Sequence, residues 1–96
     1  MNAVIIDEKD NVAVAIEPIR KGEQAQYSVG GAVKTVTVLE EIPIYHKFAT
    51  APIAKGGTVV KYGEYIGFAL RDIRAGEHVH VHNIDNRAEV REALEK

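Results

Sequence analysis

Three of the four histidines in this chain occupy alternate positions in one short segment: His78, His80 and His82. Valines fill the two positions between them. Successive side chains of a β-strand point to opposite faces, so a strand here would place the three imidazoles on one face and the valines on the other. Neighbouring imidazoles would then lie about 6.6 Å apart along the strand, and the outer two about 13 Å apart.

A row of imidazoles of this kind suits metal binding or proton transfer. Two of the three can converge on one ion at nitrogen–metal distances of about 2.1 Å, but all three cannot, so a further ligand must come from elsewhere. His46 is one candidate, in a segment where Pro43 disfavours regular strand pairing. Carboxylates are also available, at Asp7, Glu8, Glu40 and Glu41. The alternative is structural: the three histidines form the polar face of a half-buried strand, and His46 makes local hydrogen bonds.

The elements that would position these residues are short strands. Apolar segments rich in β-branched residues alternate with turn residues at brief intervals, which is typical of β-structure. Residues 3–6 and 12–16 flank a polar stretch and predict a hairpin. Gly30 and Gly31 predict a tight two-residue turn before a strand at 33–39, because a Gly-Gly pair readily supplies the positive φ angles of such turns.

Three segments share the pattern Ile-x-x-Gly: residues 18–23, 52–57 and 72–77. We interpret each as a corner in which the isoleucine anchors inward and the glycine allows the bend that precedes a new strand. The alternative is that these short matches arise by chance. Residues 58–70 predict a strand, a turn at Gly63 and a second strand with either a bulge or a close backbone approach at Gly67.

Composition bounds the remaining possibilities. The 96 residues suffice for one domain, which we assign to 1–96, with a short helical tail at 85–96 that begins near the capping residue Asn86. A net charge of −2 argues against nonspecific nucleic-acid binding, and the lack of cysteine excludes a disulfide framework. Without a signal sequence or an apolar span, we expect no membrane association and a cytoplasmic location.

The segment from Ile42 to Ile84 resembles the SAF domain, a small β-clip module found in the altronate and galactarate dehydratase family. The motifs that carry the resemblance are HK, KYGEYIG and RDI-x-x-GEHVHVHN, in that order. Tyr45 departs from the family pattern, which often has glycine before His-Lys, and so does the pair Ala51-Pro52, where a polar pair is common.

The resemblance implies a mostly β, compact β-clip fold with one short C-terminal helix. It also implies a stand-alone small subunit of a sugar-acid dehydratase, with altronate converted to 2-keto-3-deoxygluconate. Such a subunit would be inactive alone, because elimination of water needs a base, an acid and a divalent ion, most of which a large catalytic subunit would carry. The family implies ferrous iron or manganese in the assembled complex.

Site roles follow from the same resemblance. The catalytic and metal-ligand candidates are His80 and His82. The candidates for substrate contact are His46, Lys47, His78 and Asn83.

Three other interpretations compete with a dehydratase subunit. Relatives with the same small-subunit architecture eliminate sulfite from sulfolactate, so the leaving group is open. SAF-like domains also serve as non-catalytic ligand-binding modules. A structural homo-oligomer is the third alternative, because small β modules with exposed edges often pair with themselves.

Overall fold

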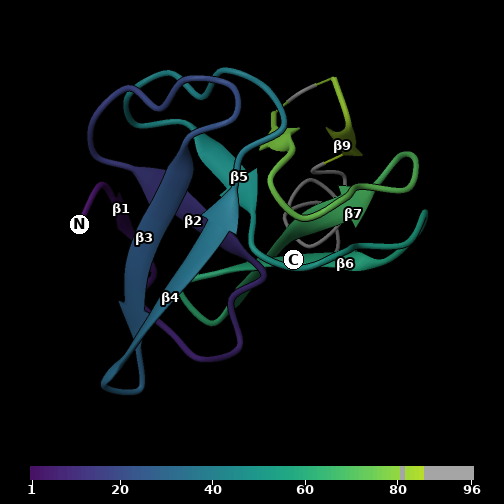
Figure 1. Ribbon diagram of the computed structural model, residues 1–96. Coiled ribbons are helices and arrows are strands. Elements are labelled where there is room, and N and C mark those ends of the chain that lie inside the picture. Colours follow the sequence, from purple (N-terminus) through teal and green to yellow (C-terminus); the bar gives the residue numbers. More distant parts are fainter. Residues whose placement is uncertain (81, 86–96) are drawn as a thin grey trace.

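The computed structural model describes residues 1–80 and 82–85, which form nine short strands in three antiparallel sheets (Figure 1). The mostly β fold predicted from the sequence is confirmed. Apart from Asp85, which ends a strand, the helix expected at 85–96 lies outside the described residues. Within the described ranges, no helix is long and apolar enough to cross a lipid bilayer.

The three sheets are built as follows. The central sheet has the strand order β1-β2-β5-β8 and consists of β1 (Ala3–Val4), β2 (Val12–Ala15), β5 (Lys47–Ala49) and β8 (His78–Val79). A two-stranded ribbon consists of β3 (Gln24–Val29) and β4 (Ala32–Thr37). The third sheet has the order β6-β7-β9 and consists of β6 (Thr58–Lys61), β7 (Glu64–Ala69) and β9 (Ile84–Asp85).

The local turns follow the sequence prediction. β1 and β2 form the first hairpin, with Ala3 opposite Ala15. Val29 pairs with Ala32, so the Gly-Gly pair makes the two-residue turn of the ribbon. The pairing of β6 with β7 shifts register between Val59 and Val60, next to Gly67, which confirms the predicted bulge.

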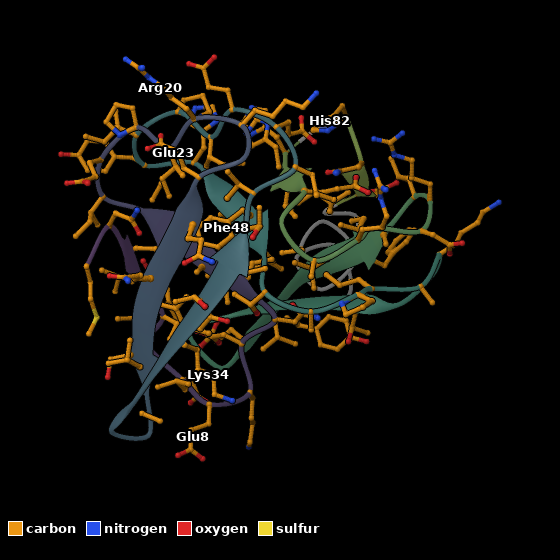
Figure 2. All side chains as sticks on the ribbon, in the orientation of Figure 1. Glu8, Arg20, Glu23, Lys34, Phe48 and His82 are labelled. Atoms are coloured by element: carbon orange, nitrogen blue, oxygen red, sulfur yellow. The ribbon has the colours of Figure 1, made fainter. Side chains whose placement is uncertain are left out.

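The central sheet lies between two hydrophobic clusters, because successive residues of its strands point to opposite faces. The ribbon cluster includes Phe48, which Figure 2 shows behind the ribbon strands, and comprises Ala3, Ala13, Ala15, Ile19, Ala25, Tyr27, Val38, Ile42 and Phe48. The second cluster, on the side of β6 and β7, comprises Val12, Ala49, Ile53, Val59, Ala69, Ile73 and Val79. Each cluster therefore takes alternate residues of β2 and β5.

The three Ile-x-x-Gly segments are equivalent corners, as predicted. Ile19, Ile53 and Ile73 are all buried. Each corner is closed by one backbone hydrogen bond. The donor is the N–H of the fourth residue after the isoleucine, and the acceptor is the carbonyl of the first residue after the isoleucine. The three bonds are Glu23 to Arg20 at 2.9 Å, Gly57 to Ala54 at 2.7 Å and Glu77 to Arg74 at 3.1 Å.

The structure adds a fourth corner of this kind, which starts at Ile42. Its closing bond runs from His46 N–H to the Pro43 carbonyl at 3.1 Å. Tyr45 stands where the other corners have glycine, and it adopts the same left-handed conformation, with φ of 68°. Tyr45 thus keeps the backbone path of the other corners without a glycine.

The corners associate in pairs. Ile19 and Ile42 exchange both backbone hydrogen bonds, at 3.0 and 2.8 Å, and Ile53 and Ile73 do the same at 2.8 Å in both directions. The first pair lies in the ribbon cluster and the second pair in the other cluster. The corner at Ile42 leads into β5 and the corner at Ile73 leads into β8. Because these two strands are antiparallel, with Lys47 opposite Val79, the start of β5 lies beside the end of β8.

Candidate functional site

The histidine segment is not one extended strand, so its predicted geometry was wrong. β8 ends at Val79, the chain bends at His80, and His82 and Asn83 lie in a turn before β9. The ring centroids of His78 and His82 are consequently 5.5 Å apart, well under the 13 Å or so expected for an extended strand. Figure 2 shows His82 at the opposite end of the view from Lys34.

Asn83 shapes this turn from within the protein. Its side chain is fully buried. The amide nitrogen Nδ2 donates to the carbonyl of His78 at 2.7 Å, and Oδ1 accepts from the backbone N–H of His80 at 3.0 Å. Its own backbone N–H donates to the carbonyl of His80 at 3.1 Å. These bonds engage both ends of the amide, which favours a positioning role for Asn83 over the substrate contact predicted from the sequence.

His46 joins the other histidines from the fourth corner. Its Nδ1 lies 2.8 Å from Nε2 of His78. The His46 ring centroid is 5.0 Å from that of His78 and 4.9 Å from that of His80. The structure thus brings together residues far apart in the sequence, because the antiparallel pairing of β5 with β8 places His46, just before β5, beside His80, just after β8. At 2.8 Å the two nitrogens cannot both present a lone pair to each other, so a proton or a cation must lie between them.

Two groups of possible metal ligands are present among the described residues. His46, His78 and His80 form the first, and Glu40, His78 and His82 form the second. Within each group the ligand atoms lie within 4.8 Å of one another. His78 belongs to both, whereas His80 and His82, paired in the sequence hypothesis, fall in different groups.

Glu40 is the member of this site that the sequence did not single out from four candidate carboxylates. It follows the ribbon, and the adjacent Leu39 donates its N–H to the Gly76 carbonyl at 2.9 Å. Oε2 of Glu40 accepts from the backbone N–H of His78 at 3.3 Å. Only tertiary contact between the end of β4 and the corner before β8 brings this carboxylate to the histidines, and no local pattern reports such a contact.

The electrostatics of the site favour the neutral form of His78. Its side chain is half-buried, and burial lowers the pKa of its imidazole. The neighbouring charge of His46 lowers this pKa further, as do His82 and His80, while Glu40 opposes them by raising it. A neutral imidazole is the form that accepts a proton or binds a metal ion.

Lys47 lies on the other face of the central sheet. It pairs with Val79, while the next residue, Phe48, pairs with His78. Directly opposite residues of an antiparallel pair share a face, so Lys47 lies with Val79 and the second cluster. Burial lowers the pKa of the Lys47 ammonium, and the positive charge of Lys61 lowers it further. The structure therefore separates Lys47 from the imidazoles with which the sequence hypothesis grouped it.

The family model of the altronate/galactarate dehydratase SAF domain matches residues 1–87. The chain belongs to this family. The SAF domain is 47% identical over 83 residues to altronate dehydratase of Escherichia coli. The aligned region covers 86% of this chain and 16% of that protein. It is 42% identical over 79 residues to altronate dehydratase of Bacillus subtilis, covering 81% of this chain and 15% of that protein.

A second kind of relative has nearly the same length as the SAF domain. It is (2R)-sulfolactate sulfo-lyase subunit alpha of Chromohalobacter salexigens, 38% identical over 87 residues, with 88% of this chain and 93% of that subunit covered. The SAF domain therefore spans about a sixth of the two altronate dehydratases and almost all of a subunit of a lyase.

Proposed function

We propose that this SAF domain is the small subunit of a two-subunit hydro-lyase that removes water from a sugar acid, with altronate as the first candidate substrate. It contributes its histidine cluster to an active site completed by a large catalytic subunit. The observation that carries the proposal is the convergence of all four imidazoles of the chain, joined by Glu40, at one place. The separate subunit alpha of the sulfo-lyase supports the small-subunit arrangement.

The chemistry of dehydration matches this cluster. Removal of the α-proton beside a carboxylate leaves negative charge on the substrate, and the hydroxyl at the next carbon must leave as water. The step therefore needs a base, an acid and a positive group near the developing charge. Burial lowers the pKa of His78 and favours the neutral form that can hold a metal ion, and whichever of the exposed His80 and His82 does not hold the ion is suited to exchange a proton with the substrate.

The donor atoms of the cluster also fit the cation that the family implies. Imidazole nitrogens and a carboxylate are ligands that ferrous iron accepts, and carboxylates suit manganese. When bound, such an ion would stabilise the negative charge that develops on the substrate. The imidazoles and Glu40 would hold it, and the large subunit would supply the other groups that bind and orient the sugar acid.

A second candidate function is elimination of sulfite from sulfolactate. The match to almost the whole of a sulfo-lyase subunit alpha favours it. Both reactions remove a proton next to a carboxylate and differ in the leaving group, so the same imidazoles would serve either. The third possibility, a non-catalytic binding module, would give a complex without turnover.

The test is co-expression with the protein encoded by the neighbouring gene. The purified complex is assayed for a 2-keto-3-deoxy acid from altronate and for sulfite from sulfolactate. Whichever product appears identifies the reaction, and a chain that forms no complex and yields no product contradicts the proposal.

Replacement of both His80 and His82 by glutamine tests the role of the imidazoles. We expect kcat to fall by about 100-fold or more, because positioned acids and bases contribute this much to proton transfer. Circular dichroism and co-purification verify that the variant folds and assembles. Glu41→Gln serves as a control on an exposed side chain close in sequence to the cluster, and should keep full activity. Wild-type turnover in the double variant would reduce the histidines to a structural role.

A further inference from the structure

We infer that this chain binds one divalent transition-metal ion by itself, with His78 as the ligand common to two alternative sets. The first set adds His46 and His80, and the second adds Glu40 and His82. The inference deepens the proposed function and rests on it for the role of the ion in catalysis. Binding is tested on the chain alone, where the partner subunit plays no part.

The closest contact in the cluster already has the spacing of two ligands. Ligand bonds of about 2.1 Å at right angles place two nitrogens about 3 Å apart. Nδ1 of His46 and Nε2 of His78 are separated by 2.8 Å. The rings of His78 and His80 are stacked, with an interplanar angle of 9° and centroids 5.5 Å apart. Small side-chain rotations would therefore bring the first set onto one ion.

In the second set, the backbone of His78, the ligand common to both sets, holds Glu40 in place. Glu40 Oε2 accepts from the backbone N–H of His78, which keeps its carboxylate beside that residue. The His82 ring lies 5.5 Å from the His78 ring, at a 38° angle, on the turn fixed by Asn83. Outer contacts of this kind orient metal ligands and contribute to affinity.

Sharing of His78 limits the site to one ion at a time. A neutral imidazole has one nitrogen with a free lone pair, and the other nitrogen carries a proton. His78 can therefore ligate in the first set or in the second, but not in both together. The structure thus predicts two arrangements of a single ion rather than two ions.

The ligand types select the class of metal. Imidazoles suit zinc, iron, nickel and copper, and two histidines with one carboxylate are the protein ligands of many non-haem ferrous centres. Magnesium and calcium prefer all-oxygen ligands. We therefore expect cobalt, zinc or ferrous ions to bind and magnesium not to compete.

The experiment is a titration of the metal-free chain with cobalt, followed by calorimetry and by visible absorption, which reports ligand geometry. We expect one ion per chain. His78→Gln should weaken binding by about 100-fold or more, since loss of an outer contact alone costs 10- to 100-fold. Glu40→Gln and His46→Gln should each retain binding within about 10-fold but change the absorption spectrum, because one set survives. Glu41→Gln is the matched control and should change neither.

Three results would overturn the inference: no binding at millimolar cobalt, two ions per chain, or wild-type affinity in His78→Gln. If His78→Gln does not fold, the double variant His46→Gln/Glu40→Gln takes its place. It removes one ligand from each set and keeps His78, so retained affinity would also contradict the shared site. A catalytically active complex whose small subunit binds no ion would overturn this inference alone, and ion binding without turnover would overturn the proposed function alone.

Discussion

Asn83 is the residue on which the placement of the imidazoles depends most directly. Its buried amide bonds the backbone on both sides of Val79, at His78 and at His80. Asn11 makes an equivalent pair of bonds elsewhere, with Oδ1 accepting from Val60 N–H and Nδ2 donating to the Thr58 carbonyl, both at 2.8 Å. Asn83 and Asn11 therefore have the same structural role, but only Asn83, of these two, lies beside the histidine cluster.

Alanine substitution at Asn83 and at Asn11 separates the effect of these bonds on stability from their effect on metal binding. Asn83→Ala and Asn11→Ala should each lower the free energy of unfolding by about 2 kcal/mol, because each leaves backbone groups without a partner. Cobalt affinity should fall by about 10-fold or more only in Asn83→Ala, as expected for loss of an outer contact that orients ligands. Urea unfolding and cobalt titration measure the two quantities. Equal cobalt affinity in both variants would show that the turn does not position the imidazoles.

Part of this site could be predicted from single residues. The alternating histidines carry the signal in their own types and spacing, and His46 was the natural fourth member. Glu40 was not distinguishable from other carboxylates, because its proximity depends on the contact between Leu39 and Gly76. The structural role of Asn83 was not predictable, because its sequence position does not reveal that its side chain folds back to bond the backbone of His78 and His80.

At the scale of structural elements, two corner glycines show that a glycine can be required for its small size as well as for its backbone conformation. Gly22 and Gly76 hold the same position in two corners, with φ of 87° and 91°. A Cβ at Gly22 would meet no atom within 4 Å, whereas a Cβ at Gly76 would clash with the carbonyl oxygen of Thr37. Gly76 is therefore required both by its backbone conformation and by the close approach of the ribbon.

Alanine substitution at the two glycines should separate these requirements. Gly22→Ala should cost about 1 kcal/mol, the strain of a left-handed alanine. Gly76→Ala should cost about 3 kcal/mol or more, because the backbone must also move away from Thr37. Thermal and urea unfolding measure both. Similar losses would mean that the ribbon shifts freely, and the contact that brings Glu40 to His78 would then be weak.

Asp10 joins two hairpins. Its Oδ2 accepts from the N–H groups of Asp7 at 3.1 Å and Ile6 at 3.3 Å, and its Oδ1 accepts from Gly63 at 2.7 Å. Burial by itself raises the pKa of this carboxyl, but backbone hydrogen bonds from Gly63, Asp7, Tyr62 and Ile6 together outweigh it and hold the pKa below its usual value. The folded state thus favours the charged form.

Stability should therefore depend on pH through Asp10. Because the pKa is lower in the folded state, the contribution is complete above the unfolded value of about 3.9 and is lost as the pH falls through the folded value. Asp10→Asn should cost about 2 kcal/mol at pH 7 and give a shallower loss of stability in acid. Urea unfolding from pH 7 to 3 measures this, with the exposed Asp72→Asn as control. Parallel curves for wild type and Asp10→Asn would contradict the assignment.

The elements that could be predicted from the sequence are those formed by interactions between residues close together in the sequence. The hairpins at Gly30 and Gly63 were predicted because turn chemistry is local. The fourth corner was missed because Tyr45 occupies the glycine position, and the histidine strand was predicted too long. In the latter case the side-chain bonds of Asn83 to the backbone of His78 and His80 prevailed over an alternation that favours an extended chain.

At the scale of the whole molecule, the central sheet couples the two hydrophobic clusters. Phe48 and Ala49 are adjacent in β5 and lie in different clusters, as do Ala13 and Val12 in β2. A loss of packing on one side should therefore displace strands that also form the other side. We expect the domain to unfold in one cooperative transition.

Phe48→Ala tests this coupling. The side chain is completely buried, and its truncation should cost about 3 to 5 kcal/mol. Hydrogen exchange should then show equal loss of protection at Ala25 in the ribbon cluster and at Val59 in the second cluster. Loss of protection confined to the ribbon side would show instead two independently stable halves.

The fourth corner has a consequence for the detection of distant relatives. Main-chain hydrogen bonds close all the corners described above, and Tyr45 demonstrates that the bend tolerates a bulky side chain. Sequences that have drifted away from glycine at these places can therefore retain the same chain path. A search profile weighted on the four inward isoleucines would find them, whereas one weighted on Ile-x-x-Gly would overlook them.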